Sequence, residues 1–202
     1  MDYLYSIDSD RVAEIKIKRS TFICCLRYVG TISDAKFFIS SVSSEHKTAT
    51  HNCWAYIVGD KGEISHSSDN GEPAGTAGKP MLNSLQKYNM TNVAAVVTRY
   101  YGGVKLGVRG LIDAYSQAVV SSIEVAPLKK LVHIRRYAID LSYPFNDTLI
   151  HHLSNWDVKI IDTRYSDRIS HDIEVESDKC QDVERLLIEY QSCGKLKFLH
   201  KP

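Results

Sequence analysis

Apolar and polar residues alternate along much of the last third of the chain, a pattern typical of strands with one buried face. The alternation is clearest from Tyr137 to Tyr143 and from Ile169 to Val175. Two shorter stretches predict further strands, over residues 158–165 and 195–199. Between the strands, apolar residues at helical spacing predict two helices. The inner face of the first consists of Leu149, Ile150, Leu153 and Trp156. The inner face of the second consists of Val183, Leu186, Leu187 and Tyr190.

The order of these elements is β-α-β-β-α-β, the ferredoxin-like split βαβ pattern. We expect Asn146 to cap the first helix, because its side chain can accept a hydrogen bond from a free backbone N–H. Asp178 and Gln181 have the spacing of a capping box at the start of the second helix. Gly194 suits the position just past the end of that helix, where a left-handed backbone is common.

The chain up to Pro127 mixes strands and helices less regularly. Strands are expected over residues 12–18, 22–29, 53–58, 64–67 and 93–98, and helices over residues 33–45, 81–88 and 108–124. Ser33 is expected to cap the first of these helices, and Lys61 with Gly62 to form the turn of a hairpin. Pro127 should end the last helix, because the residue before a proline disfavours the helical conformation. We therefore expect an α/β (α+β) chain with two domains, residues 1–128 and 131–202.

Composition narrows the class of protein. The chain has 202 residues, is 44% hydrophobic and 24% charged, and carries a formal net charge of +1, which excludes wholesale disorder and a general attraction to nucleic acid. Its five cysteines include no C-x-x-C pair, which argues against a disulfide framework or a zinc ribbon. The polar N-terminus does not resemble a signal peptide, and no apolar run approaches the roughly 20 residues of a membrane span. We expect a cytoplasmic protein with reduced thiols and no membrane partner.

A glycine-rich, cationic segment lies between the predicted buried strand at residues 93–98 and the long helix that follows. It contains Arg99, Lys105 and Arg109 and has no acidic residue from Arg99 to Leu111. A glycine turn at a helix N-terminus presents free N–H groups and a positive dipole end, which suits phosphate. The spacing matches neither common nucleotide-binding motif, so the alternative is a tight turn with solvated cations. If the segment binds phosphate, the tyrosine rings could also stack on nucleic-acid bases. The predicted site then consists of Arg99, Tyr100, Tyr101, Gly102, Gly103, Lys105 and Arg109.

Two other segments could contribute to a cleft. Asp69, Glu72 and Thr76 lie on a long Gly/Pro loop, where turn and capping chemistry competes with an acid/base or magnesium role. His51 and Cys53 share a strand face, as a nucleophile pair would, but the sequence offers no third member. A zinc site would need two further ligands. We predict no metal and no cofactor.

Four elements of the sequence resemble the YigZ/IMPACT family. They are Lys18–Ile23, Ala49–Tyr56, Ser68–Pro80 and Val96–Tyr115, and together they cover the first block almost fully. Arg109 departs from the family pattern, in which a small residue is common. The resemblance implies a βαβ first domain like one of a small-subunit ribosomal protein and elongation-factor domain IV. It also implies a ferredoxin-like second domain similar to domain V of elongation factor G.

Both of those fold relatives contact RNA, and eukaryotic family members regulate translation under stress through protein partners. Our leading hypothesis is therefore a non-catalytic protein that binds RNA or the ribosome, by fold analogy. The first alternative is an enzyme or small-ligand site built from His51, Cys53, Asp69, Glu72, Thr76 and Arg99, which requires that these side chains converge in a pocket. The second is a protein–protein adaptor that uses an apolar face of the second domain's sheet.

Overall fold

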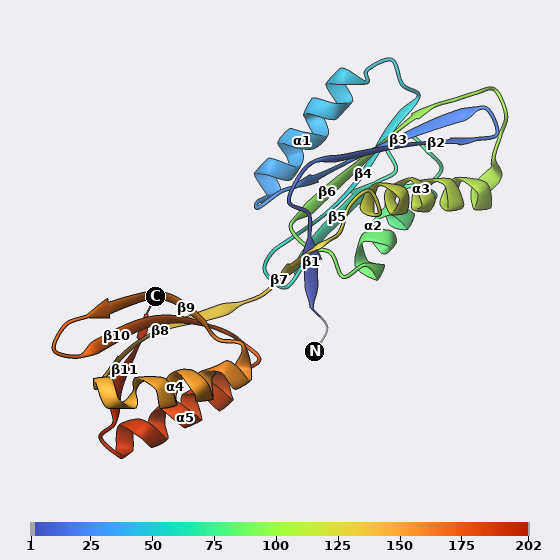
Figure 1. Ribbon diagram of the computed structural model, residues 1–202. Coiled ribbons are helices and arrows are strands. Elements are labelled where there is room, and N and C mark those ends of the chain that lie inside the picture. Colours follow the sequence, from blue (N-terminus) through green and yellow to red (C-terminus); the bar gives the residue numbers. More distant parts are fainter. Residues whose placement is uncertain (1–2, 202) are drawn as a thin grey trace. The chain divides into compact units, whose positions relative to one another are not determined.

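The computed structural model describes residues 3–201, which form two compact units. The first unit ends at Leu131 and the second begins at Val132 (Figure 1). The sequence placed the domain boundary between residues 128 and 131. The short strand β7 (Lys129–Leu131) belongs to the first unit because it pairs there with β1 (Leu4–Ser6), a contact that the sequence did not predict.

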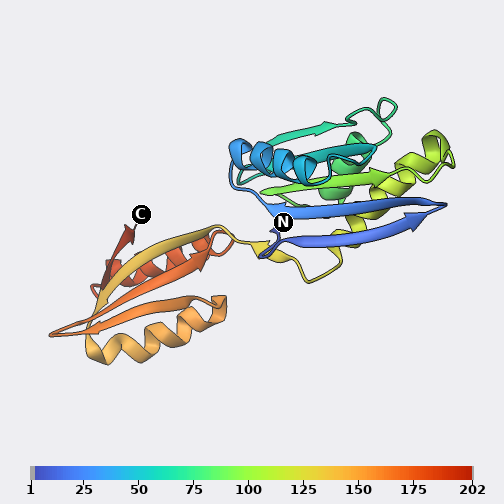
Figure 2. The same cartoon turned by 90° about the horizontal axis from the view of Figure 1, so that it is seen from above.

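A five-stranded sheet forms the centre of the first unit. Its strands are β2 (Arg11–Ile17), β3 (Ser20–Tyr28), β4 (His51–Val58), β5 (Ile64–Ser68) and β6 (Val93–Tyr100). Their spatial order is β2-β3-β6-β4-β5, which Figure 2 shows from the blue β2–β3 hairpin at one edge to the blue-green β5 at the other. Every neighbouring pair is antiparallel. β3 and β4 are thus parallel to each other on either side of β6, so β3, the helix after it and β4 form a split βαβ unit.

Helices cover both faces of this sheet (Figure 1). The helix α1 (Ile32–Glu45) packs Ala35, Phe38 and Val42 on one face, against β4 and β6. The helices α2 (Gly78–Lys87) and α3 (Gly107–Ile123) cover the other face. Because side chains alternate along a strand, successive residues of β4 and β6 enter two separate cores.

The second unit has the expected ferredoxin-like arrangement. Its elements are β8 (Ile134–Leu141), η1 (Tyr143–Phe145), α4 (Asn146–Leu153), η2 (Ser154–Trp156), β9 (Lys159–Tyr165), β10 (Ile169–Glu176), α5 (Cys180–Ser192) and β11 (Leu196–Lys201). The strands follow the order β11-β8-β10-β9, all antiparallel, and inward residues of α4 and α5 share one core with them. The mixed α/β class predicted from the sequence is therefore confirmed. Across residues 3–201, no helix is both long enough and apolar enough to span a bilayer.

Three predicted helix caps are wrong, each by one or two residues. The cap of α1 is Thr31 rather than Ser33, and its hydroxyl accepts a hydrogen bond from the Asp34 N–H at 3.1 Å. The helix α4 already includes Asn146, whose amide oxygen lies 2.8 Å from Nε2 of His171 and thus serves the core. The helix α5 begins at Cys180, so Asp178 lies one residue too early to cap it. Gly194 does follow α5 with a φ of +69°, as predicted.

Arg11 joins β2 to the end of α3. Its side chain is buried, and its guanidinium donates hydrogen bonds to three backbone carbonyls, those of Ile123, Ala126 (2.8 Å) and Pro127 (2.7 Å). These carbonyls lie at and just beyond the C-terminal turn of α3, where intrahelical donors run out and the helix dipole is negative. A single cation therefore satisfies the end of the helix and the chain that leaves it.

We expect Arg11→Met to lower the free energy of unfolding of the first unit by about 2–4 kcal/mol, because it leaves buried carbonyls without donors. Urea unfolding can be followed by the fluorescence of Trp54 in a Trp156→Phe background, since the chain has only two tryptophans. Arg27→Met is the matched control, because Arg27 pairs with Asp10 at the exposed surface and should contribute less than about 1 kcal/mol. Equal losses in the two variants would contradict the role given to Arg11.

Candidate functional site

The three segments that the sequence singled out meet at one end of the five-stranded sheet. β4 and β6 are antiparallel neighbours, and their register places His51 opposite Arg99. The loop between β5 and α2 returns over the same end, where the backbone oxygen of Asn70 lies 3.1 Å from Nδ1 of His51. Residues 101–106 lead from β6 into α3 on that side. The antiparallel pairing thus gathers residues that lie up to about 60 positions apart in the sequence.

A pocket of about 510 Å³ opens where these segments meet. Its lining combines charged and aromatic side chains with an apolar wall from the start of α3. The lining residues are Thr50, His51, Glu72, Pro73, Arg99, Tyr101, Lys105, Leu106, Gly107, Val108 and Leu111. The convergence that the small-ligand alternative required is therefore present for His51, Glu72 and Arg99.

The floor of the pocket holds a buried ion pair between Glu72 and Arg99. Nη1 of Arg99 lies 2.6 Å from Oε1 of Glu72, and the two side chains are only 6% and 3% exposed. The same oxygen accepts a hydrogen bond from the Tyr115 hydroxyl at 2.8 Å, and Oε2 lies 4.0 Å from Nε2 of His51. A buried carboxylate needs this many partners because removal from water costs several kcal/mol for each ion.

Aromatic rings enclose the Arg99 guanidinium. Its central carbon lies 5.4 Å from the ring centre of Phe22 in the core and 5.3 Å from that of Tyr101 at the pocket rim. Nη2 lies 3.4 Å from the hydroxyl of Ser20, while Nε is buried without a partner among the described residues. Arg99 therefore connects the carboxylate on the floor to the tyrosine on the rim.

Cys53 and Tyr115 lie behind the pocket, not in its lining. The Cys53 thiol is fully buried, donates to the backbone oxygen of Asp69 at 2.8 Å and lies 3.4 Å from the Tyr115 hydroxyl. Burial, the largest cause, raises the pKa of Cys53 to about 12. Burial likewise raises the pKa of Tyr115 well above its usual range. Both groups are thus protonated at neutral pH and act as hydrogen-bonding core residues.

Asp69 organises the loop that carries Glu72. Its carboxylate accepts three backbone hydrogen bonds, from Gly75 (2.8 Å), Ala77 (2.9 Å) and Gly78 (2.8 Å). Desolvation alone would raise the pKa of Asp69, but these N–H donors outweigh it and lower the pKa. Thr76 closes the same loop by donating to the backbone oxygen of Pro73 at 2.7 Å. Both residues therefore shape the pocket from outside it.

The glycines after β6 allow the backbone conformation and close packing of this segment. A Cβ atom on Gly102 would lie 1.8 Å from the backbone oxygen of Arg19, so this position requires glycine for close approach to the β2–β3 turn. Gly103 has a φ of +81°, which glycine adopts without strain. Gly102, which was predicted from the sequence to belong to the phosphate site, therefore makes its close contact with another part of the same chain.

The predicted phosphate-binding residues divide into two groups. Arg99, Tyr101 and Lys105 line the pocket, and Lys105 and Tyr101 are exposed there. The Tyr100 hydroxyl lies 2.9 Å from Nδ1 of His46, and Arg109 is exposed on α3 outside the pocket lining. Only some of the predicted phosphate-binding residues therefore line the pocket.

Sequence reasoning missed Thr50, Ser20 and Tyr115 as parts of the site. Tyr115 was assigned to the inner face of α3, where it does lie, but helical periodicity does not reveal that its hydroxyl meets Glu72. The four sequence elements of the family resemblance were the available signal, because Tyr115 ends the last of them and Ser20 lies in the first. Across residues 3–201, no cluster of three or more His, Cys, Asp or Glu side chains is arranged to hold a metal ion.

Comparisons with known proteins identify relatives of this chain. The family model described as the Impact N-terminal domain matches residues 18–123, which include every pocket residue. The IMPACT family member YigZ of Escherichia coli is 34% identical over 186 residues, covering 91% of each chain. YvyE of Bacillus subtilis is 43% identical over 132 residues, so this chain spans about 61% of its length. A solved structure described as a hypothetical protein matches all of this chain and 98% of its own at 31% identity, with a TM-score of 0.62. The chain therefore belongs to the IMPACT family.

Proposed function

We propose that this chain is a non-catalytic binding protein that holds a backbone phosphate of single-stranded RNA in the pocket at the start of α3. The observation that carries the proposal is the open N-terminus of α3 in the pocket wall, beside Lys105. The cap position of α3 is Leu106, whose apolar side chain can accept no hydrogen bond from the first N–H groups. Those donors and the positive end of a 17-residue helix suit an oxyanion.

The charges of the pocket favour an anion as its ligand. Glu72 is the acidic residue of the lining, and Arg99 neutralises it. Lys105 and the helix end then remain as positive groups, and the first acidic residue of α3, Asp113, lies six residues beyond Gly107. A phosphate oxygen can therefore approach without facing an unbalanced carboxylate.

Tyr101 supplies a surface for a base next to the phosphate. The residue is 45% exposed, and the Arg99 guanidinium lies against its ring, 5.3 Å from the ring centre. Aromatic rings in single-strand binding proteins stack on bases of any sequence. In this proposal Arg99 positions Tyr101 and Glu72 instead of contacting the phosphate itself. An association with translation is what the family resemblance implies for such an RNA ligand.

A second candidate is a small phosphorylated ligand. The concave shape of the pocket and the convergence of His51, Glu72 and Arg99 favour it. Covalent chemistry is less favoured, since Cys53 is buried and its pKa is raised to about 12. The adaptor alternative draws less support, because the outer face of the second sheet carries ion pairs such as Arg136–Glu174 and Lys201–Asp172.

The first test is the salt dependence of RNA binding. For Lys105→Gln we expect weaker binding of a labelled single-stranded RNA and a slope of log affinity against log salt that is shallower by about 0.7, the value of one phosphate contact. Fluorescence anisotropy at several salt concentrations measures the slope. Lys61→Gln is the matched control, because Lys61 lies at the far end of β4, in the β4–β5 turn. A slope that does not change in Lys105→Gln would sink the phosphate assignment, and binding of nucleoside monophosphates but not RNA would favour the small ligand.

The second test addresses the nucleophile alternative. At pH 8, a thiol with a pKa of about 12 is ionised in roughly one molecule in 10⁴, and thiolate is the reactive form. We expect iodoacetamide to modify the exposed Cys193 and to leave Cys53 unmodified in the folded protein. Peptide mass spectrometry over time measures both rates. Modification of Cys53 as fast as Cys193 would restore the covalent alternative.

The third test separates the buried ion pair from the ligand. Glu72→Gln keeps an acceptor but leaves the Arg99 charge unbalanced, so we expect a loss of about 3 kcal/mol in the free energy of unfolding. Asp10→Asn, which uncouples the exposed Arg27 pair, should cost less than about 1 kcal/mol. Urea unfolding of both variants gives the comparison, and a Glu72→Gln protein as stable as wild type would show that the pair does not support the site.

A further inference from the structure

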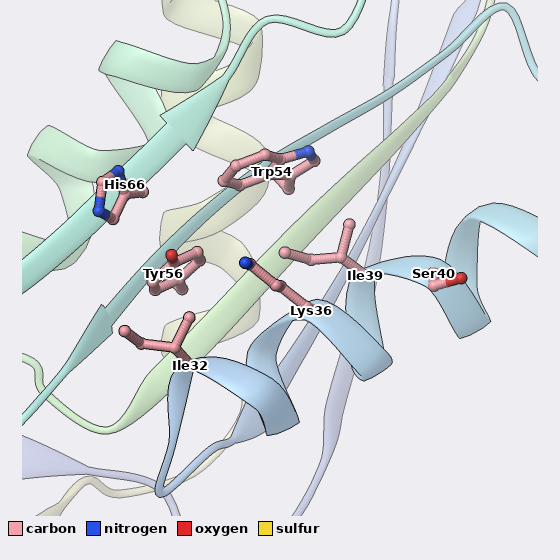
Figure 3. Close-up of a pocket in the computed structure, with 7 residues that line it drawn as sticks. All are labelled: Ile32, Lys36, Ile39, Ser40, Trp54, Tyr56 and His66. Atoms are coloured by element: carbon pink, nitrogen blue, oxygen red, sulfur yellow. The ribbon is translucent and has the colours of Figure 1, made fainter.

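A second hollow lies between α1 and the edge of the five-stranded sheet (Figure 3). This groove has a volume of about 470 Å³ and is lined by Ile32, Lys36, Ile39, Ser40, Trp54, Tyr56 and His66. Its floor comes from β4 and β5, and its wall comes from α1. Trp54 and Tyr56 point to the α1 side of the sheet, whereas His51 and Cys53, at odd positions of β4, point to the α3 side. The groove and the anion pocket are thus separate sites.

Three rings form a continuous row along the floor of the groove. Trp54 and Tyr56 are two residues apart on β4, and their rings lie 5.8 Å apart with planes only 13° from parallel. Tyr56 pairs with His66 across to β5, and those ring centres are 5.5 Å apart. Tyr56 is buried in the middle, while Trp54 is half-buried and His66 is exposed. The row therefore ends in ring surface that a ligand can reach.

Lys36 supplies the charge of the groove. Its side chain reaches from α1 toward Trp54 and Tyr56 (Figure 3). No carboxylate lines the groove, and within the described part of the chain the Lys36 ammonium has no acidic partner. A row of aromatic rings with one cation at its side complements a ligand that combines a planar ring with a nearby negative charge.

We propose that this groove binds one unstacked base of a single-stranded RNA, with the base against Trp54 and the adjoining phosphate on Lys36. A base can stack on the half-buried Trp54 ring, and its phosphate matches the single cation. An acidic peptide would match the cation but would not use the ring surface, which makes it the less favoured occupant. The proposal does not depend on the anion pocket, because it uses different residues on the opposite face of the sheet.

Trp54 itself reports on the groove. In a Trp156→Phe protein it is the only tryptophan, so its fluorescence can be titrated with a ten-nucleotide uridine RNA at low salt. We expect quenching that saturates, because a base stacked on the indole quenches its emission. An abasic ribose-phosphate chain of the same length carries the charge without the bases and should leave the fluorescence unchanged.

Two variants and a control test the residues of the groove. In the Trp156→Phe protein, Lys36→Gln should weaken the quenching titration several-fold, whereas Lys87→Gln, an exposed lysine of α2 outside both pockets, should leave it unchanged. Trp54→Leu should reduce the affinity for labelled RNA by about 5-fold or more, as expected for the loss of one stacked base. Because Lys36 is exposed on α1, Lys36→Gln keeps the proposal testable even if Trp54→Leu proves unstable.

The results that would overturn the proposal are equally specific. Absence of quenching at low salt, or equal quenching by the abasic chain, would exclude a stacked base. Quenching by an acidic peptide but not by RNA would assign the groove to a protein partner. Absence of quenching together with a salt slope that still depends on Lys105 would overturn the groove proposal and leave the anion pocket standing.

Discussion

The buried ion pair of Glu72 and Arg99 is the interaction on which the site depends. Each charge is removed from water, so each must be satisfied by the other and by groups brought from elsewhere in the chain. Tyr115 comes from α3, His51 from β4 and Ser20 from β3. The pair can therefore form only when the sheet, the loop after β5 and the last helix of the first unit are all in place. The pocket therefore assembles only when the first unit has folded.

The two faces of the five-stranded sheet carry hollows of different chemistry. On the α3 side, buried charge and an uncapped helix start create a polar pocket. On the α1 side, a single helix leaves part of the sheet uncovered, and aromatic rings with one cation occupy that space. The alternation of side chains along β4 is the cause of this division, because neighbouring residues of one strand necessarily serve opposite faces. One short strand, His51–Val58, thus contributes to two surfaces of unlike chemistry.

Periodicity predicted most of the fold but little of the site. The five strands, the β4–β5 hairpin and the ferredoxin-like order of the second unit followed from local patterns of apolar residues. The predictions of helix caps were wrong for two reasons. At α1 a nearby residue, Thr31, is the cap, and at α4 the Asn146 side chain contacts His171 in the core instead. The β1–β7 pair joins segments more than 120 residues apart and has no local signal. From the sequence, Glu72 and Arg99 belonged to one candidate cleft, but their direct contact could not be predicted because it depends on the three-dimensional fold. The buried position of Cys53 and the contact between Tyr115 and Glu72 depend on the fold in the same way.

The hydrogen bonds that Arg11 donates to the end of α3 have a consequence for the synthesis of the protein. The Arg11 guanidinium lies on the second strand, but its acceptors are the carbonyls of Ile123, Ala126 and Pro127. The strand β1 bridges Met90 through Tyr5, but its antiparallel strand partner is Lys129–Leu131. In a nascent chain, therefore, the Arg11 guanidinium remains solvated and β1 lacks its β7 partner until the residues up to Leu131 have left the exit tunnel. These two contacts should therefore form late in translation, after the strands of the central sheet have been synthesised.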